Sequence, residues 1–343
     1  MGCETGGIEP AVVVVHNIDP AWEADDTAAV WETVQHLVAA LNSEGHRVFE
    51  VPVTGMDLAA ALAPYDPREH IVFNWCEELP GLPRSDAQVV SQLERLGYTY
   101  TGSPPDVLSL SWDKAAVKSL LTGHAVPTPF GRVVHEDRAQ GWDRFPAIVK
   151  PAFEHCSVGV DSNAVVLDAQ ALHERVAYVR NAFAQPVLVE EFIDGREFHV
   201  TLWGNGRIEM LPPAEMDFSA FADVRDRLCT FDSKFTPGSR HYEGVELRIP
   251  ASMTEAELAE LQRTSEAAYR WVGCRDYARL DLRLRDEIFY VLDINPNADI
   301  SPDTSLAYAA EAAGMTYGAF ASRLVRLAAS RRRGPSAASE ACV

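Results

Sequence analysis

Lysine is scarce in this sequence of 343 residues. Lys and Arg together number 30, and only four of these are lysine (Lys114, Lys118, Lys150 and Lys234), which leaves 26 arginines. Because arginine serves almost every basic position, the few lysines are candidates for tasks that suit a compact ammonium group, such as contact with a phosphate. The alternative is a GC-rich codon bias that left four lysines by chance, and only their positions in the chain can separate the two.

Long apolar runs and paired cysteines are also missing. No stretch approaches the roughly 18 uninterrupted apolar residues of a membrane-spanning helix. The start lacks the basic and apolar regions of a secretory signal, since Glu4 precedes any apolar run. The six cysteines contain no Cys-x-x-Cys pair and are too dispersed for a disulfide scaffold. We therefore expect a cytoplasmic protein with reduced cysteines.

Positive charge is in the minority. The 30 Lys and Arg stand against 50 Asp and Glu, which gives a formal net charge of −20. Such a charge repels phosphate backbones and anionic lipid, so we expect neither nucleic acid nor a membrane as a partner. A small anionic ligand in a local basic pocket stays compatible with this charge. The length exceeds the about 250–300 residues at which a single core stops growing, so two or three lobes are expected.

The first hundred residues alternate short apolar strands with amphipathic helices. Strands are predicted at 12–15, 48–51 and 70–74, and helices at about 25–45 and 85–97. This pattern is typical of an open parallel sheet, whose ligands bind at the carboxyl ends of the strands. Residues 16–17 and 74–77 lie at those ends. A Gly-x-Gly-x-x-Gly motif does not follow the first strand, so a dinucleotide site is not expected there.

Gly and Pro residues at 101–105 mark a first domain boundary. A small α+β region follows, with a helix from Asp113, strands at 130–134, 147–150 and 186–192, and a helix from Asp168. The remainder has a strand at 197–203, an irregular stretch at about 212–244, a helix that opens with the capping box Thr254–Glu257, a hairpin at 277–294 and two closing helices (304–313 and 316–330). Irregular segments longer than about 12–15 residues are uncommon unless they serve a site.

Polar and apolar residues alternate in the hairpin. A period of two places Arg279, Asp281 and Arg283 on one face of its first strand, and Asp293 and Asn295 on one face of its second. Two carboxylates and an amide on neighbouring strands suit Mg²⁺, which prefers oxygen ligands. The alternative is a solvated sheet face with cross-strand Arg–Asp pairs.

Two further features lie at strand ends. Lys150 ends an apolar strand before the small-residue loop at 152–159, an arrangement that can cradle a phosphate. A lysine at the strand edge that extends into solvent fits the pattern as well. The strand at 187–192 becomes acidic at Glu190 and Glu191. Its backbone could hydrogen-bond an adenine, or the strand could simply end there.

Taken in order along the chain, these residues resemble the ATP-grasp ligases, and within them the D-alanine–D-alanine ligase-like branch. The resemblance covers about residues 71–328. It rests on Val72-Phe73-Asn74, Tyr100-Thr101-Gly102-Ser103, Asp113-Lys114, Lys150-Pro151, Ser157-Val158-Gly159, Glu190 with Glu197, Arg279-x-Asp281 and Asp293-x-Asn295.

The fold that this resemblance implies is a three-lobed ATP-grasp fold of α/β and α+β character. Residues 1–104 would form an N-terminal open parallel α/β sheet, and 105–192 a small central α+β lobe with its phosphate loop at 152–159. Residues 193–330 would form a C-terminal α+β lobe with a mainly antiparallel sheet and the metal site. Residues 331–343 would be a flexible tail.

The resemblance also implies roles for individual residues. ATP phosphates would be contacted by Lys114, Lys150 and the loop residues Ser157, Val158 and Gly159, and the terminal phosphates by Lys234. The adenine hinge would be Glu190, Glu191, Phe192 and Ile193, with Glu197 on the ribose. Two Mg²⁺ ions would be held by Asp281, Asp293 and Asn295. Arg279 would stabilise charge on the reacting acyl centre, so the expected catalytic residues are Arg279, Lys234 and Ser157. Lys118 is expected on the surface.

The substrate-binding parts depart from the family pattern. Residues 16–20 (His-Asn-Ile-Asp-Pro) stand where the family has a glutamate segment, and His155-Cys156-Ser157 where it has Gly-Ser-Ser. The family's Asn-x-x-Pro-Gly segment reads Asn-Pro-Asn-Ala-Asp at 295–299, and Phe235 replaces a tyrosine. Candidate specificity residues are His16, Asn17, Glu77, Glu78, Cys156, Arg279 and Asp299.

The expected function is an ATP-dependent carboxylate–amine ligase that forms an amide or dipeptide bond between small amino-acid-like substrates. It would act through an acyl phosphate, release ADP and phosphate, and serve specialised metabolism. Three alternatives stay open: a true D-alanine–D-alanine ligase, a small-molecule kinase that would release ADP without phosphate, and a non-catalytic nucleotide-binding protein. The complete metal triad and Arg279 argue against the last. A homodimer is what the family suggests.

Overall fold

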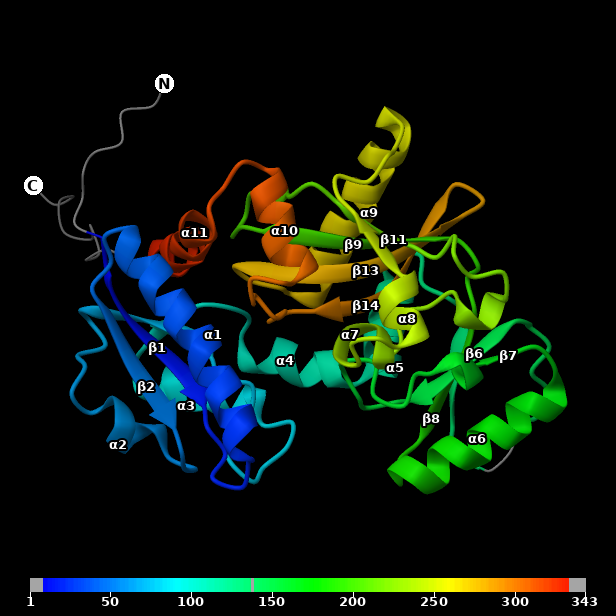
Figure 1. Ribbon diagram of the computed structural model, residues 1–343, viewed down its shortest axis with the longest axis horizontal. Helices are drawn as coiled ribbons and strands as arrows, with labels where there is room; N and C mark the ends of the chain where they lie inside the picture. Colours follow the sequence, from blue (N-terminus) through cyan, green and yellow to red (C-terminus); the bar gives the residue numbers. More distant parts are fainter. Residues whose placement is uncertain (1–8, 137–138, 333–343) are drawn as a thin grey trace, which may run out of the picture. The chain divides into compact units, whose positions relative to one another are not determined.

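The structure is a computed structural model that describes residues 9–136 and 139–332 (Figure 1). The chain divides into two compact units. The first comprises the chain up to Pro105 together with the segment from Met315 onward, and the second comprises Asp106–Gly314. Within the described residues, each helix is too short or too polar to cross a bilayer.

The first unit is built on an open sheet of four parallel strands in the order β2-β1-β3-β4. These strands are β1 (Ala11–Asn17), β2 (Val48–Val53), β3 (His70–Trp75) and β4 (Thr99–Tyr100). The central run Val12–Val15 is fully buried, as expected of a parallel strand covered on both faces. The helices of this unit are α1 (Ala24–Ser43), α2 (Leu58–Leu62), α3 (Asp86–Arg95) and α11 (Tyr317–Ser330). The predicted open parallel sheet is confirmed.

The C-terminal helix α11 packs against α1 in the first unit. Ser322 of α11 also hydrogen-bonds through its Oγ to Nε2 of His46, which lies just after α1, at 2.7 Å. The boundaries expected from the sequence had placed this helix in the C-terminal lobe. Arg331 and Arg332, expected in the tail, donate hydrogen bonds to backbone carbonyls of the first unit. The rest of the predicted tail, 333–343, lies outside the described residues.

The second unit contains two antiparallel sheets. The smaller has the order β5-β8-β6-β7, with strands β5 (Gly131–Val134), β6 (Ala147–Pro151), β7 (Val165–Val166) and β8 (Val187–Glu191). Helix α6 (Ala169–Phe183) lies along this sheet (Figure 1). Its apolar side chains pack against those of β6 and β8 in one buried cluster. The helix begins where predicted, because the Asp168 carboxylate accepts a hydrogen bond from Ala171 N at 2.9 Å.

The larger sheet has the order β12-β11-β9-β13-β14, and β10 pairs with β9. Its strands are β9 (Arg196–Trp203), β10 (Glu209–Met210), β11 (Ala214–Asp217), β12 (Glu246–Arg248), β13 (Tyr277–Arg285) and β14 (Ile288–Asn295). Helices α4 (Pro105–Trp112), α5 (Lys114–Gly123), α9 (Glu255–Val272) and α10 (Ser305–Ala312) complete the unit. Residues of α5, α9 and the sheet share one core. The capping box at Thr254 and Glu257 is present, and the mainly antiparallel sheet is confirmed.

The stretch at 212–244 is more ordered than the sequence indicated. It contains β11, a 3₁₀ turn at Val224–Asp226, and the short helices α7 (Asp232–Phe235) and α8 (Arg240–Gly244). Phe221 and His241 stack with ring centroids 5.0 Å apart, which ties the segment before the 3₁₀ turn to α8. The prediction of one irregular segment was wrong because elements of three to five residues are too short to show a hydrophobic period.

The hairpin of β13 and β14 departs from strict alternation at one position. Asp281 pairs with Asp293, but the next residue, Leu282, pairs with Val291. Leu292 is therefore an extra residue in β14, which defines a β-bulge. Because of the bulge, Leu292 and Asp293 both line the same pocket. Bulges are frequent beside active sites, where they redirect a side chain.

Candidate functional site

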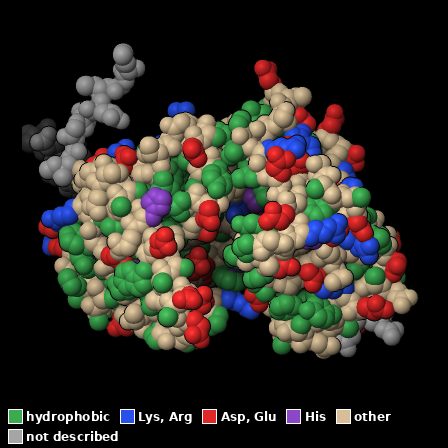
Figure 2. All heavy atoms as spheres, in the orientation of Figure 1, with side chains coloured by type: hydrophobic (Ala, Val, Ile, Leu, Met, Phe, Trp, Pro, Cys, Tyr) green, Lys and Arg blue, Asp and Glu red, His purple; other side chains and the backbone are tan. Residues whose placement is uncertain are grey.

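A pocket in the second unit gathers most of the predicted nucleotide residues. Both sheets, the start of α5, helix α7 and the loop after β6 contribute to its lining. Of the predicted residues, the lining includes Lys114, Lys150, Ser157, Val158, Glu190, Glu191, Phe192, Ile193, Glu197, Lys234, Asp281 and Asp293. Three of the four lysines thus meet in one pocket. Acidic side chains are scattered over the face drawn in Figure 2, and carboxylates also accompany the lysines in the pocket lining, among them Glu190, Asp281 and Asp293.

Glu190 lies between two lysines in this pocket. The Lys150 ammonium is 2.5 Å from Glu190 Oε2, and the Lys118 ammonium contacts Oε1. Burial alone would raise the pKa of the Glu190 carboxyl, but Lys118 and Lys150 lower it to about 2. The expectation that Lys118 is a surface residue was wrong: 12% of its side chain is exposed. The backbone of Glu190 remains the predicted hinge, while its side chain sets the position of two cations.

Glu197 is held by an arginine that the sequence interpretation did not use. Arg283 Nε donates to Glu197 Oε2 at 2.8 Å, and both side chains are buried. Arg283 also donates to Ile193 O at 2.8 Å and lies over the Phe192 ring at 4.5 Å. Burial would raise the pKa of Glu197, but Arg283 and His199 hold it well below its usual range. Arg283 therefore ties the predicted ribose partner to the hinge strand.

The carboxylates predicted to bind metal come from paired positions on adjacent strands. Asp281 accepts two hydrogen bonds from Arg279, at 2.8 and 3.0 Å, and Asp293 Oδ2 lies 3.0 Å from Lys114 Nζ. Asn295 pairs with Arg279 in the register of the two strands. Burial alone would lower the pKa of Arg279, but Asp281 and Asp293 raise it above its ordinary value. The Asp293 pKa is lowered by Lys114, His155 and Lys150 in spite of its burial.

This donor set fits Mg²⁺. Asp281 and Asp293 present carboxylate oxygens to one pocket. Asn295, on the same strand as Asp293, lies outside the pocket lining, and its Nδ2 donates to Arg279 O at 3.4 Å. Magnesium prefers such oxygen donors and is commonly shared with substrate phosphates. Arg279 pairs with Asp281 and Lys114 pairs with Asp293, so both carboxylates already have a positive charge beside them.

The loop after β6 has an unusual backbone. Cys156, Ser157 and Gly159 have φ angles of 55°, 60° and 74°, all in the left-handed region. A Cβ atom at Gly159 would lie 2.9 Å from both the Phe183 ring and Pro151 Cγ, so glycine is required there. Ser157 Oγ donates to Cys229 O at 3.0 Å, which joins the loop to the segment before α7.

Four of the predicted specificity residues belong to the first unit. His16 is buried at the end of β1, where its Nε2 lies 3.1 Å from Glu50 Oε1. Asn17 Oδ1 accepts a hydrogen bond from Glu77 N at 3.2 Å. The pKa of Glu78 is raised by burial and by a neighbouring aspartate. These side chains lie at the carboxyl edge of the parallel sheet, as the strand pattern predicts.

The remaining predicted residues lie in the second unit. Asp299 is exposed, and its Oδ1 accepts from Ser301 N at 2.9 Å and from Ser301 Oγ at 2.6 Å. Its carboxylate thus closes a local turn. Cys156 is exposed in the predicted phosphate loop, and the neighbouring His155 ring meets the Trp112 ring edge-on, with centroids 4.2 Å apart.

Comparison with known proteins places the chain in a family. A sequence-family model described as "D-ala D-ala ligase C-terminus" matches residues 133–326. The uncharacterized protein y4sG of Sinorhizobium fredii is 35% identical over 289 residues, 82% of each chain. The D-alanine–D-alanine ligase of Desulforudis audaxviator is 31% identical over 302 residues, 86% of this chain and 92% of the relative. The D-alanine–D-alanine ligase of Bacillus anthracis, solved with ATP, superposes with a TM-score of 0.72 at 20% identity, covering 94% and 98% of the two chains.

These similarities and the fold define an enzyme of the ATP-grasp class. The chain belongs to the D-alanine–D-alanine ligase family. It is an ATP-dependent, ADP-forming carbon–nitrogen ligase of the carboxylate–amine type, and the family uses ATP and Mg²⁺.

The sequence interpretation did not assign four further residues to this site. Lys118, Arg283, His199 and Cys229 lie within or beside the pocket and contact its predicted residues. The scarcity of lysine could have pointed to Lys118, and the alternation in β13 had already placed Arg283 on the correct face. His199 follows Glu197 by two residues on β9, so period two put both on one face. Cys229 lies in an irregular segment and gave no signal.

Proposed function

We propose that this ligase forms an amide or dipeptide bond between two amino-acid-like substrates in specialised metabolism. A carboxylate oxygen of the first substrate attacks the γ-phosphorus of ATP, which gives an acyl phosphate and ADP. The amine of the second substrate then attacks the acyl carbon, loses a proton, and the carbon–oxygen bond to phosphate breaks. The products are the amide, ADP and phosphate.

The observation that carries this proposal is the convergence of cations and carboxylates in one pocket. Lys114, Lys150 and Lys234 would contact ATP phosphates there, and bound Mg²⁺ would neutralise phosphate charge. Arg279 is aligned by its paired hydrogen bonds to Asp281 and would stabilise negative charge on the acyl centre. Most of the rate enhancement would come from position and electrostatics, since a phosphoryl or acyl transfer needs both partners held in line.

The substrate class rests on a second set of residues. Asp19 and Glu78 place two neighbouring carboxylates at the carboxyl edge of the sheet in the first unit, which suits recognition of an ammonium group. The segment at 295–299 and the His155-Cys156 pair differ from the pattern of the D-alanine–D-alanine ligases. These departures favour substrates other than D-alanine.

The test is substrate-dependent release of ADP and phosphate with Mg²⁺-ATP, over pooled D- and L-amino acids and related acids. Equal release of both products in at least one pool, with a hydroxamate formed when hydroxylamine replaces the amine, is the expected result. Lys150→Met should abolish it, whereas Arg207→Met, at a side chain 89% exposed, should not. ADP without phosphate in every active pool would instead identify a kinase.

The second candidate is D-alanine–D-alanine ligation itself, which is the named activity of relatives 29–31% identical to this chain. D-Alanine alone would then give full activity, and the pools that lack D-alanine would give none. Assembly as a homodimer, which the family resemblance suggests, stays a prediction that light scattering can test.

A further inference from the structure

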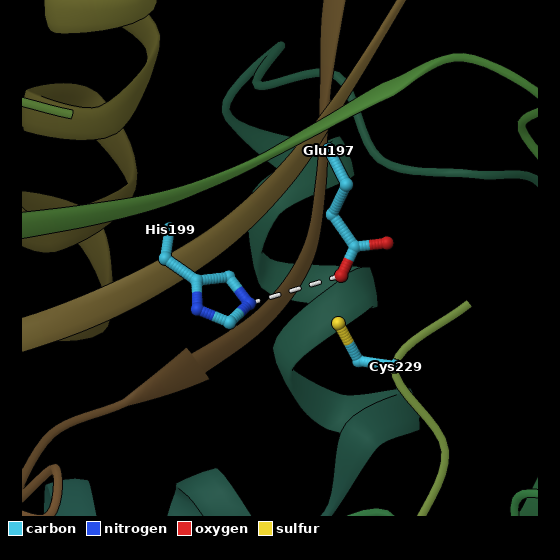
Figure 3. A group of neighbouring side chains, drawn as sticks. All are labelled: Glu197, His199 and Cys229. Carbon is cyan, nitrogen blue, oxygen red and sulfur yellow. Dashed lines mark ion pairs between the residues drawn. The ribbon is translucent and has the colours of Figure 1, made fainter. Parts of the chain in front are cut away.

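Glu197 and Cys229 of the pocket lining form a cluster with the neighbouring His199. Glu197, His199 and Cys229 each offer one metal-ligand atom, and these atoms lie within 4.8 Å of one another (Figure 3). Glu197 and His199 project from the same face of β9, and Cys229 approaches from the segment before α7. A carboxylate, an imidazole and a cysteine sulfur together form a typical ligand set of borderline-soft metal ions, which displace the thiol proton when they bind.

The two oxygens of Glu197 serve different neighbours. Oε2 accepts the hydrogen bond from Arg283 at 2.8 Å, whereas Oε1 faces His199 Nε2 at 3.8 Å. The distance of 3.8 Å is too long for a hydrogen bond. Oε1 and Nε2 therefore lie close to each other and to the Cys229 sulfur without a direct hydrogen bond between them, while Arg283 keeps the carboxylate in place.

His199 is oriented as metal-binding histidines are. Its Nδ1 lies 3.2 Å from Ser305 Oγ, at the start of α10. A hydrogen bond at one ring nitrogen fixes the ring and leaves the other nitrogen for a metal. His199 Nε2 also lies 3.8 Å from Asp281 Oδ1, so the imidazole stands between the cluster and a carboxylate predicted to bind Mg²⁺.

We infer that Glu197, His199 and Cys229 form a second metal site, selective for a borderline-soft divalent ion of the Zn²⁺ class. Mg²⁺ is excluded from this role by its preference for oxygen ligands, while Zn²⁺ binds sulfur, nitrogen and oxygen. Three protein ligands leave one coordination position for water or another oxygen.

Metal at this site inhibits the ligase. This consequence rests on the proposed function and on the predicted role of Glu197 as the ribose partner of the bound ATP. A metal bound to Oε1 removes charge from that carboxylate, and a metal bound to Cys229 fixes the segment whose carbonyl accepts from Ser157 of the phosphate loop. The nucleotide and the Zn²⁺-class ion therefore compete for the same part of the pocket.

Binding is tested first with Co²⁺ as the probe, on the full chain in excess Mg²⁺ and without nucleotide. A thiolate–Co²⁺ absorption band in the near ultraviolet is expected. Added Zn²⁺ should displace the Co²⁺ ion and remove the band. The band should be lost in Cys229→Ser and in Cys229→Ala, and kept in Cys274→Ser, which removes another cysteine of the second unit. A band that is absent from the unaltered chain, or that survives both Cys229 variants, overturns the site.

Histidine variants provide an independent measurement. His199→Gln should weaken Zn²⁺ binding, measured by calorimetry, by at least about tenfold. Ser305→Ala removes only the hydrogen bond to His199 Nδ1 that orients the ring, and should weaken Zn²⁺ binding by about tenfold. His124→Gln is the matched control, since the His124 ring stacks on Trp271 away from the cluster, with centroids 3.5 Å apart. Equal Zn²⁺ affinity in His199→Gln and His124→Gln would exclude His199 as a ligand.

The inhibitory role has its own readout. A fluorescent ATP analogue should bind more weakly when Zn²⁺ is present, so a higher concentration of the analogue should be needed for half-maximal binding. This shift should be lost in Cys229→Ser. If Zn²⁺ binds through the cluster and nucleotide affinity is unchanged, the inhibitory role is wrong and the metal site stands. If no nucleotide binds under any condition, the proposed function fails while the Co²⁺ result still decides the site.

Discussion

Lys150 Nζ lies 2.5 Å from Glu190 Oε2, and the Lys118 ammonium contacts the other oxygen of the same carboxylate. Lys118 also donates to Thr128 Oγ1 at 2.8 Å, so it is fixed from two sides. Glu190 is therefore a buried anion between two cations. Lys118 shares the neutralisation of this carboxylate, which leaves Lys150 with charge to offer a phosphate.

Lys118→Met should weaken nucleotide binding indirectly, through the effect of Lys118 on Glu190 and Lys150. Once Lys118 is gone, Lys150 becomes the single counterion of Glu190 and is less available to phosphate, so we expect about tenfold weaker ATP binding. Loss of one partner of a buried pair should also lower the free energy of unfolding by about 3 kcal/mol. Fluorescent nucleotide titration and urea denaturation measure both, with Lys118→Arg as the variant that keeps the charge. Unchanged affinity in Lys118→Met would contradict this role.

Glu190 should make stability depend on acid pH. Its pKa falls from an ordinary value of 4.5 to about 2 in the folded chain. Because the folded pKa is the lower one, the stabilisation is fully present above about pH 4.5 and is lost as pH falls toward about 2. The unaltered chain should therefore lose about 2 kcal/mol more than Glu190→Gln between pH 5 and pH 3. Denaturation curves that run parallel over this interval would contradict the prediction.

Gly159→Ala should damage the phosphate loop through a steric clash. A Cβ at Gly159 meets Phe183 and Pro151 at 2.9 Å, and φ is +74°. Gly141 has a similar φ of +69° but nothing within 4 Å, so Gly141→Ala isolates the conformational cost. We expect Gly141→Ala to cost about 1 kcal/mol of unfolding free energy, and Gly159→Ala to cost more and to raise the KM for ATP. Equal effects in the two variants would contradict the clash.

Arg279→Lys should impair the reaction more than nucleotide binding. Lysine keeps the charge but loses the planar fork that makes two hydrogen bonds to Asp281. We expect kcat to fall about 100-fold, the loss typical of one misplaced charge-stabilising group, with nucleotide affinity changed by less than about threefold. Phosphate release and nucleotide titration give the two numbers. A kcat close to that of the unaltered chain would exclude Arg279 from the reacting centre.

The elements that carry a clear hydrophobic period could be predicted from the sequence. Val12–Val15 and its neighbours form the parallel sheet, and Thr254 with Glu257 forms the capping box. The bulge at Leu292 could not be predicted, because one inserted residue leaves the composition of a strand unchanged. The short turns at 224–244 were missed for lack of any period.

In the candidate site too, only the residues that belong to a clear sequence pattern could be predicted. Lys114, Lys150 and Asp293 could be proposed because each follows a recognisable strand or helix signal, and they line one pocket. Lys118 was misjudged although it lies one helical turn after Lys114, and so on the same face of α5, because it matched no motif of the family. His199 and Cys229 meet only through long-range packing, 30 residues apart on unlike segments.

The central claim is that a carboxylate is activated as an acyl phosphate in the second unit. The most direct measurement uses the acyl donor found in the pool experiment, labelled with ¹⁸O in its carboxylate, and mass analysis of the released phosphate. Transfer of one donor oxygen to each phosphate is the predicted result, because the carbon–oxygen bond breaks when the amine attacks. Phosphate without the label, released at the same rate as the amide, would contradict the mechanism.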